Sequence, residues 1–157
     1  IELCQQLDKI DAVFVALGGG GLISGIGHYV KSKHPRAQII ACSPENSHVM
    51  IQSLQAGEIL DLPSLPTLSD GTAGGVESGS ITFDLCQQII DHTVTVTEAE
   101  IAAELKTFMS TQHQLIEGAA AVALASYVKL KDQFQNQTIA IIICGGNISL
   151  DTLAPLL

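Results

Sequence analysis

Four consecutive glycines have the spacing that most directly indicates chemistry in this chain: Gly18, Gly19, Gly20 and Gly21. They follow an apolar run over residues 12–17 and precede a helical pattern that begins at Leu22. Glycine loses the most backbone entropy on folding, so such a run is costly unless it supplies a geometry that other residues cannot adopt. Backbone N–H groups at a helix N-terminus, helped by the helix dipole, form a site for an anion such as phosphate. The run therefore predicts an anion-binding loop. A turn without a ligand is the alternative, although it needs only one or two glycines.

Two nucleotide-binding motifs also place glycines after a strand. The dinucleotide fingerprint G-x-G-x-x-G is not met, because Gly19, Gly21 and Gly25 leave one extra spacer. Glu45 lies beyond the second expected strand, where an acid that binds ribose would be sought, so a dinucleotide stays open as a weaker alternative. A nucleotide P-loop is excluded, because no Gly-Lys-Ser/Thr follows the glycines.

Composition restricts the class of protein that carries this loop. The 157 residues are 46% hydrophobic and 15% charged, which predicts one packed globular domain over residues 1–157. A net charge of −9 with only seven Lys and Arg residues argues against nucleic acid as a partner. No apolar stretch is long enough to span a membrane, and no signal peptide is visible. Four scattered cysteines without a C-x-x-C pair give no metal signature and favour reduced thiols in a cytoplasm.

The elements that must position the glycines alternate along the chain. Buried strands are expected over residues 12–17, 38–42 and 138–144, and the alternating, β-branched segment 92–96 is expected to be an edge strand. Helices are expected over 2–9, 22–33, 47–54, 81–90 and 118–131. Thr97 and Glu100 form a capping box that opens a further helix, and Ser47 and Ser80 are expected helix caps. A last helical turn is expected over residues 151–157. Residues 58–80, rich in Pro and Gly, are expected to be a long functional or mobile loop.

This order predicts an α/β fold, a doubly wound and mostly parallel sheet with helices on both faces. Ligands in such sheets bind beyond the carboxyl ends of the strands. The glycines, the loop over residues 43–46 and the segment 144–147 all follow strands directly. We therefore expect these loops to gather on one rim of the sheet.

Four short motifs, in order and at suitable distances, carry a resemblance to a known family: ALGGGGL at 16–22, LSDG at 68–71, IEG at 116–118 and CGGN at 144–147. Together they resemble the C-terminal half of the pyridoxal-phosphate serine/threonine dehydratases and their racemase relatives, of fold type II. The resemblance extends over nearly the whole chain. It implies the large-domain half of a tryptophan-synthase-β-like fold and pyridoxal 5'-phosphate as the cofactor.

The resemblance also assigns roles to individual residues. It implies that backbone N–H groups of the glycines and of Leu22 hold the cofactor phosphate. Gly71, next to Asp70, would lie near the cofactor ring, and so would Glu117. Cys144 would face the pyridine nitrogen, where a neutral thiol leaves that nitrogen largely unprotonated, as β-elimination of a hydroxyl allows. Three alternatives remain open: Cys144 as an ordinary buried cysteine, Glu117 as a first-turn acid that the helix dipole favours, and Asp70-Gly71 as a common turn pair.

Two departures from the family pattern limit what this chain is expected to do. The Schiff-base lysine of the family lies in a Ser-Phe-Lys type motif well before the glycines, and neither that motif nor the small covering domain is present. We therefore expect a fragment that contains no catalytic residue and is inactive alone. The racemase-like members bind a divalent cation through carboxylates where this chain has Ser43, Ser47 and Val49, so no metal is expected.

The resemblance thus predicts part of a longer lyase that dehydrates and deaminates a 3-hydroxy amino acid such as threonine or serine. The alternative is a stand-alone, non-catalytic domain of the same fold that binds a phosphorylated ligand or a partner. The expected partner is a small amino-acid substrate. Binding to nucleic acid or to a membrane is not expected. Apolar surface left without a covering domain also predicts a homo-oligomer.

Overall fold

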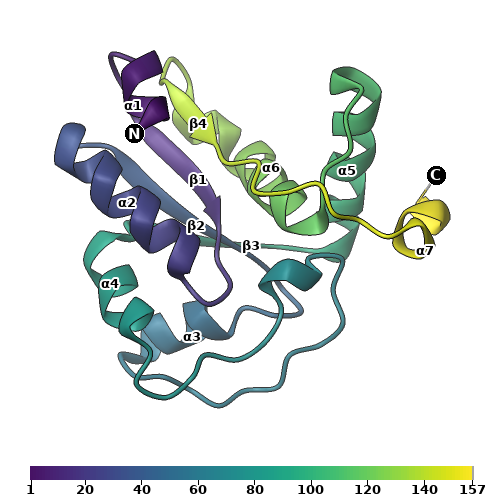
Figure 1. Ribbon diagram of the computed structural model, residues 1–157, viewed down its shortest axis with the longest axis horizontal. Coiled ribbons are helices and arrows are strands. Elements are labelled where there is room, and N and C mark those ends of the chain that lie inside the picture. The colour runs from purple at the N-terminus through teal and green to yellow at the C-terminus, as the bar shows by residue number, and fades with distance from the viewer. Residues whose placement is uncertain (157) are drawn as a thin grey trace.

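Four parallel strands form the central sheet of the protein (Figure 1). The computed structural model describes residues 1–156. The strands are β1 (Ala12–Ala16), β2 (Gln38–Pro44), β3 (His92–Val96) and β4 (Ile139–Ile141). Their order in the sheet is β3-β2-β1-β4, with Phe14 of β1 opposite Ile40 of β2 and Ile141 of β4. The predicted parallel sheet is therefore confirmed.

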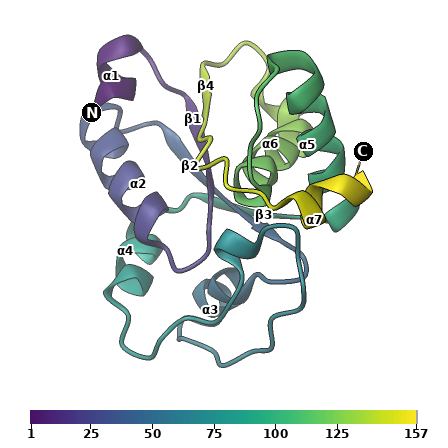
Figure 2. The same cartoon turned by 45° about the vertical axis from the view of Figure 1, so that its right-hand side comes forward.

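Helices cover both faces of this sheet, as Figure 2 shows. One face carries α1 (Glu2–Gln6), α2 (Gly21–Lys33), α3 (Val49–Ala56) and α4 (Ile81–Ile89), and the other carries α5 (Glu98–Gln112) and α6 (Gly118–Leu130). The remaining elements are the 3-10 turns Asp70–Thr72, Lys131–Phe134 and Ala154–Leu156 and the short helix α7 (Leu150–Leu153). The predicted doubly wound α/β class is thus confirmed.

Strand β1 illustrates why an unbroken apolar run was needed. Val13 and Val15 point into the core under α2, α3 and α4, whereas Phe14 points into the core under α6. Phe14 makes edge-to-face contacts with Tyr127 and Phe134, at centroid distances of 5.6 and 5.3 Å. Every residue of the strand is buried, as expected of a parallel strand covered on both faces.

Strand β4 is shorter than the expected 138–144. It pairs only with β1, and the last sheet bond beyond it runs from Ile142 N to Phe14 O at 3.0 Å. The chain then leaves the sheet, and Gly145 O accepts a bond from Glu117 N at 3.1 Å instead. After Ile142 the chain therefore makes a backbone hydrogen bond to the start of α6 and no longer to strand β1.

Of the three expected caps, only Thr97 caps its helix through its side chain. Glu100 N donates to Thr97 Oγ1 at 3.2 Å and Thr97 N donates to Glu100 Oε2 at 2.7 Å, which confirms the capping box. Ser80 takes the N-cap position of α4 without a side-chain cap bond. Ser47 is wrong as a cap, because α3 begins after His48 and the Ser47 hydroxyl accepts bonds from the long loop.

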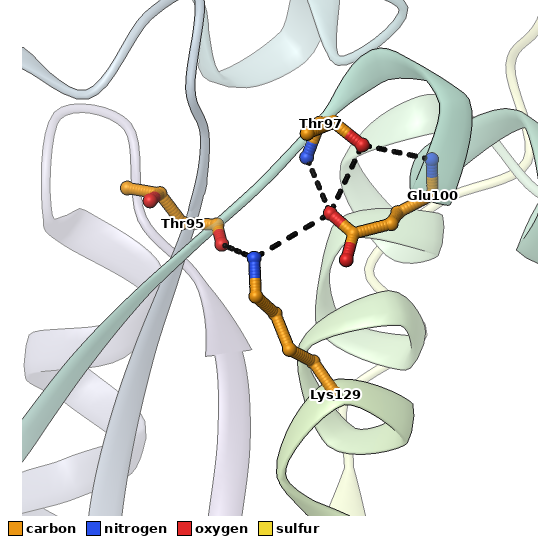
Figure 3. Close-up of polar contacts among 4 residues, drawn as sticks. All are labelled: Thr95, Thr97, Glu100 and Lys129. Atoms are coloured by element: carbon orange, nitrogen blue, oxygen red, sulfur yellow. Dashed lines mark hydrogen bonds and ion pairs between the residues drawn. The ribbon is translucent and has the colours of Figure 1, made fainter.

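Lys129 of α6 contacts the edge strand β3 next to this capping box (Figure 3). Its Nζ donates to Thr95 O of β3 at 3.0 Å and lies 3.6 Å from Glu100 Oε2. Strand β3 lies at one edge of the sheet, where backbone groups have no neighbouring strand to bond. The contact thus ties α6, β3 and the start of α5 together.

The C-terminal turn predicted over residues 151–157 is present as α7 and the 3-10 turn after it, and Leu157 lies outside the described residues. No helix in residues 1–156 is both long and apolar enough to cross a membrane.

Candidate functional site

A cavity of about 260 Å³ opens where the carboxyl ends of β1 and β4 diverge. Strands β2 and β3 follow β1 on one side and β4 lies on the other, so this is the switch point of the sheet, where α/β proteins bind ligands. All eight residues predicted to contact a cofactor line this cavity: Gly18, Gly19, Gly20, Gly21, Leu22, Gly71, Glu117 and Cys144. The structure therefore brings together residues that the sequence separates by more than one hundred positions.

The first wall is the glycine loop, residues 18–21, between β1 and α2. Gly20 has a left-handed φ of 85° and takes the N-cap position of α2, a conformation that favours glycine. A Cβ built on Gly19 or Gly21 would meet no atom within 4 Å, so these positions leave open space. The first N–H groups of α2 have no partner within the helix, which leaves donors for an anion at this wall.

The second wall is the turn Asp70–Thr72 within the long loop. A Cβ on Gly18 would lie 2.9 Å from the Thr72 backbone, so glycine permits the close approach of this turn. Gly71 lines the cavity, but the exposed Asp70 does not. The Asp70 carboxylate instead accepts a bond from Gly71 N at 2.8 Å and shapes the turn.

Side chains from other elements hold the long loop in place. Leu68 N donates to Glu98 Oε2 at 2.7 Å, directly before the turn. Ser47 Oγ accepts bonds from Ser64 Oγ at 2.6 Å and from Gly74 N at 3.1 Å. The loop that the sequence marked as functional or mobile is thus tethered on both sides of the cavity wall.

The third wall is formed by Glu117 and Cys144. Glu117 is the N-cap residue of α6, and its Oε2 accepts a bond from Asn147 N at 3.2 Å. A Cβ on Gly145 would overlap the Glu117 carboxylate, so glycine lets that carboxylate lie against the chain after β4. Glu117 is thus the N-cap residue of α6 and not a first-turn acid, and its side chain lines the cavity.

The Cys144 thiol is half-buried, unlike the fully buried Cys42 and Cys86. Desolvation, and then the negative charge of Glu117, raise the pKa of Cys144 above its ordinary value. The side chain is therefore a neutral thiol at physiological pH. Because it also lines the cavity, it differs from an ordinary core cysteine.

Three lining residues were missed by sequence reasoning: Ala16, Thr72 and Ala119. Each lies within two positions of a predicted lining residue, so closeness to the motifs in the sequence could have indicated that it lines the cavity. Within residues 1–156, no group of three or more His, Cys, Asp or Glu side chains could hold a metal ion.

The parallel sheet, with the glycine loop at its switch point and a cavity between three loops, defines an α/β protein whose cavity has the features of an anion site. The family described as "Pyridoxal-phosphate dependent enzyme" matches residues 1–145. The chain belongs to this family.

Three individual proteins illustrate what the chain is similar to in sequence and structure. The chain is 35% identical over 148 residues to the biosynthetic L-threonine dehydratase of Halalkalibacterium halodurans. The aligned region covers 94% of this chain and 35% of the relative. The processed threonine deaminase isoform 2 of Solanum lycopersicum is 33% identical with a TM-score of 0.90, covering 99% of the chain and 46% of that structure. Serine racemase from Dictyostelium discoideum is 34% identical with a TM-score of 0.85, covering 95% and 48%. The chain thus spans less than half the length of each of these relatives.

The cavity fits the cofactor of the family in two respects. The open space at Gly19 and Gly21 leaves the helix N-terminus accessible to a phosphate group. Across the cavity, the neutral Cys144 thiol offers a weak donor and acceptor for a ring nitrogen. The residues present therefore suit both the phosphate and the ring of pyridoxal phosphate.

Proposed function

We propose that this chain forms one α/β domain of a longer enzyme that dehydrates and deaminates a 3-hydroxy amino acid such as threonine or serine. The observation that carries the proposal is the meeting of the glycine loop, the turn Asp70–Thr72, Glu117 and Cys144 around one cavity. The threonine dehydratase and threonine deaminase among the relatives support the same reaction.

When bound, pyridoxal phosphate supplies an electron sink that makes the α-proton and the 3-hydroxyl of an amino acid easier to remove. In this proposal, the N–H groups of the glycine loop bind the phosphate and so orient the ring. Cys144 would face the ring nitrogen and leave it largely unprotonated, because its thiol stays neutral and keeps its proton. Desolvation, and then the charge of the Glu117 carboxylate that Asn147 N fixes, raise the pKa of the thiol and keep it protonated, and this carboxylate would lie beside the ring.

No lysine is among the residues that line the cavity. The lysine that holds the cofactor covalently and the cover over the substrate would therefore come from the rest of the longer protein. We propose that the chain alone binds the cofactor reversibly and has no lyase activity. Association with a second copy and a cytoplasmic location belong to the same proposal.

Titration of the chain with pyridoxal phosphate, with pyridoxal as the matched control, tests the binding site. Because the glycine loop contributes phosphate donors, pyridoxal phosphate is expected to bind at least about tenfold more tightly than pyridoxal. Inorganic phosphate should compete, and borohydride should trap no cofactor in the cavity. Equal affinity for both compounds, without competition by phosphate, would contradict the proposal.

The second candidate is a non-catalytic domain that binds a phosphorylated ligand, which the missing cavity lysine favours. Sequencing the transcript upstream of the codon for Ile1 distinguishes the two functions. An in-frame upstream segment with a Ser-Phe-Lys type motif supports the enzyme, whereas a start codon next to Ile1 supports the binding domain.

A further inference from the structure

Helix α4 supports the glycine loop from outside the cavity. The Thr82 hydroxyl donates to Gly19 O at 2.6 Å, and Cys86 Sγ lies 3.8 Å from Gly20 O. Thr82 and Cys86 are one turn apart on α4, so they present the same face to two successive carbonyls. Helix α4 contributes no residue to the cavity lining, and it packs beside α2 (Figure 1).

These contacts fix the direction of two peptide groups. In a planar trans peptide the C=O and the following N–H point in opposite directions. The bond from Thr82 turns Gly19 O towards α4, so Gly20 N–H points away from α4. Gly20 O accepts from Ser24 N at 3.0 Å, so Gly21 N–H points away from the helix. Both donors are thereby directed towards the open side of the loop.

Glycine makes this support necessary. The peptide between Gly19 and Gly20 is flanked by residues that accept positive and negative φ about equally well, so it can flip at small cost. A flipped peptide would present a carbonyl oxygen to the ligand and repel an anion. The close packing of the loop on α4 resists that flip, since a Cβ on Gly20 would lie 2.8 Å from Cys86 Sγ.

The hydroxyl of Thr82 is itself oriented by a neighbour. Ser80 Oγ lies 2.8 Å from Thr82 Oγ1. A threonine hydroxyl has one proton, and Thr82 gives it to Gly19 O, so Ser80 is the donor in this contact. Ser80, whose hydroxyl makes no bond to the start of its helix, thus supports Thr82 instead.

We propose that Thr82 is a positioning residue for the anion site, holding the peptide between Gly19 and Gly20 so that its N–H faces the phosphate. This inference rests on the proposed function, because it concerns the phosphate group of the same cofactor. Thr82 lies on the far side of the loop from the cavity, so it acts on the ligand only through the glycines.

The test is a titration of the 157-residue chain with inorganic phosphate, followed by the backbone amide NMR signals of Gly20 and Gly21. Thr82→Val removes the hydroxyl and keeps the shape, and Thr82→Ser keeps the hydroxyl. Thr107→Val is the matched control, because the exposed Thr107 hydroxyl also donates to a backbone carbonyl, that of Ala103. Thr82→Ala is measured in parallel, so that poor folding of one variant does not decide the result.

Thr82→Val and Thr82→Ala are expected to weaken phosphate binding about tenfold, which corresponds to about 1.4 kcal/mol, and to shift the Gly20 amide signal before phosphate is added. Thr82→Ser should bind within about twofold of the parent chain, as should Thr107→Val. Unchanged affinity in the valine and alanine variants would overturn the positioning role while leaving the proposed function intact. A parent chain that binds neither phosphate nor pyridoxal phosphate would overturn both.

Discussion

Two walls of one cavity are built in different ways. The glycine loop joins β1 to α2 in four residues, and its shape follows from residues that tolerate a φ of 85°. The long loop, residues 58–80, contains one short 3-10 turn, and side chains far away in the sequence hold it. The first wall depends on local backbone geometry and the second on tertiary contacts.

This contrast predicts different responses to substitution. Changing a glycine in the first wall should damage the anion site at the position changed. The second wall should fail when its anchors are removed, even though these anchors do not touch the cavity. The first three of the following substitutions test that distinction and the fourth tests a contact outside both walls, from the largest expected effect to the smallest.

Gly118→Ala is expected to have the largest effect. A Cβ on Gly118 would overlap the Leu68 carbonyl, so α6 and the long loop cannot both keep their positions. We expect a loss of about 3 kcal/mol in the free energy of unfolding, measured by urea denaturation. Gly25→Ala is the control, because a Cβ there meets open space on the exposed side of α2 and should stabilise by about 0.5 kcal/mol. Equal effects of the two substitutions would argue against close packing of the long loop on α6.

Gly20→Ala should come second. Its left-handed backbone and the close Cys86 Sγ predict a loss of about 2 kcal/mol in unfolding free energy, together with loss of phosphate binding. Gly57→Ala has a similar φ of 79° at the end of α3 but open space around it, so it should be destabilised less and bind phosphate normally. Isothermal titration calorimetry separates the two outcomes. Normal phosphate binding by Gly20→Ala would show that the loop geometry is not required.

Glu98→Ala should make the long loop around residues 68–72 more mobile without unfolding the protein. The variant loses the bond from Leu68 N to a carboxylate, which is expected to lower the local stability of the loop by about 1.5 kcal/mol. Hydrogen exchange should become faster at the amides of residues 68–72 and remain unchanged in β1. Glu104→Ala on the same helix is the control. Faster exchange throughout the sheet would instead indicate that Glu98 stabilises the whole fold.

Glu100→Gln should have the smallest effect. Burial raises the pKa of Glu100, but the hydrogen bonds from Thr97 and the charge of Lys129 outweigh this, so the net pKa lies below its ordinary value of 4.5. A carboxylate with a lowered pKa stabilises the folded state above pH 4.5, and that contribution is lost as the pH falls through the lowered value. Since the side chain is 37% exposed, the charge should contribute only a few tenths of a kcal/mol. Thermal unfolding of the parent and of Glu100→Gln should therefore differ at pH 7, and the difference should shrink as the pH is lowered below 4.5. A difference that does not change with pH would show that the charge is not its source.

Some elements were predictable because their signals are local. The capping box of Thr97 and Glu100 needs only residues three apart, and the structure contains both of its bonds. The buried strands β1 and β2 follow from apolar runs. Ser47 resembled a cap by the same local rule, but its hydroxyl bonds Gly74 N, 27 residues away. No local pattern distinguishes those two uses of a serine.

The amino-acid sequence by itself determined the positions of the strands, the glycine loop between β1 and α2, and the motifs that line the cavity. These features depend on backbone conformations and side-chain polarity within a few residues. Only the tertiary structure decided that β4 leaves the sheet after Ile142, that Glu98 anchors the long loop and that Thr82 holds the Gly19 carbonyl. Such contacts join residues that approach one another only after the sheet has formed, because a hydrogen bond depends on distance in space and not on separation along the chain.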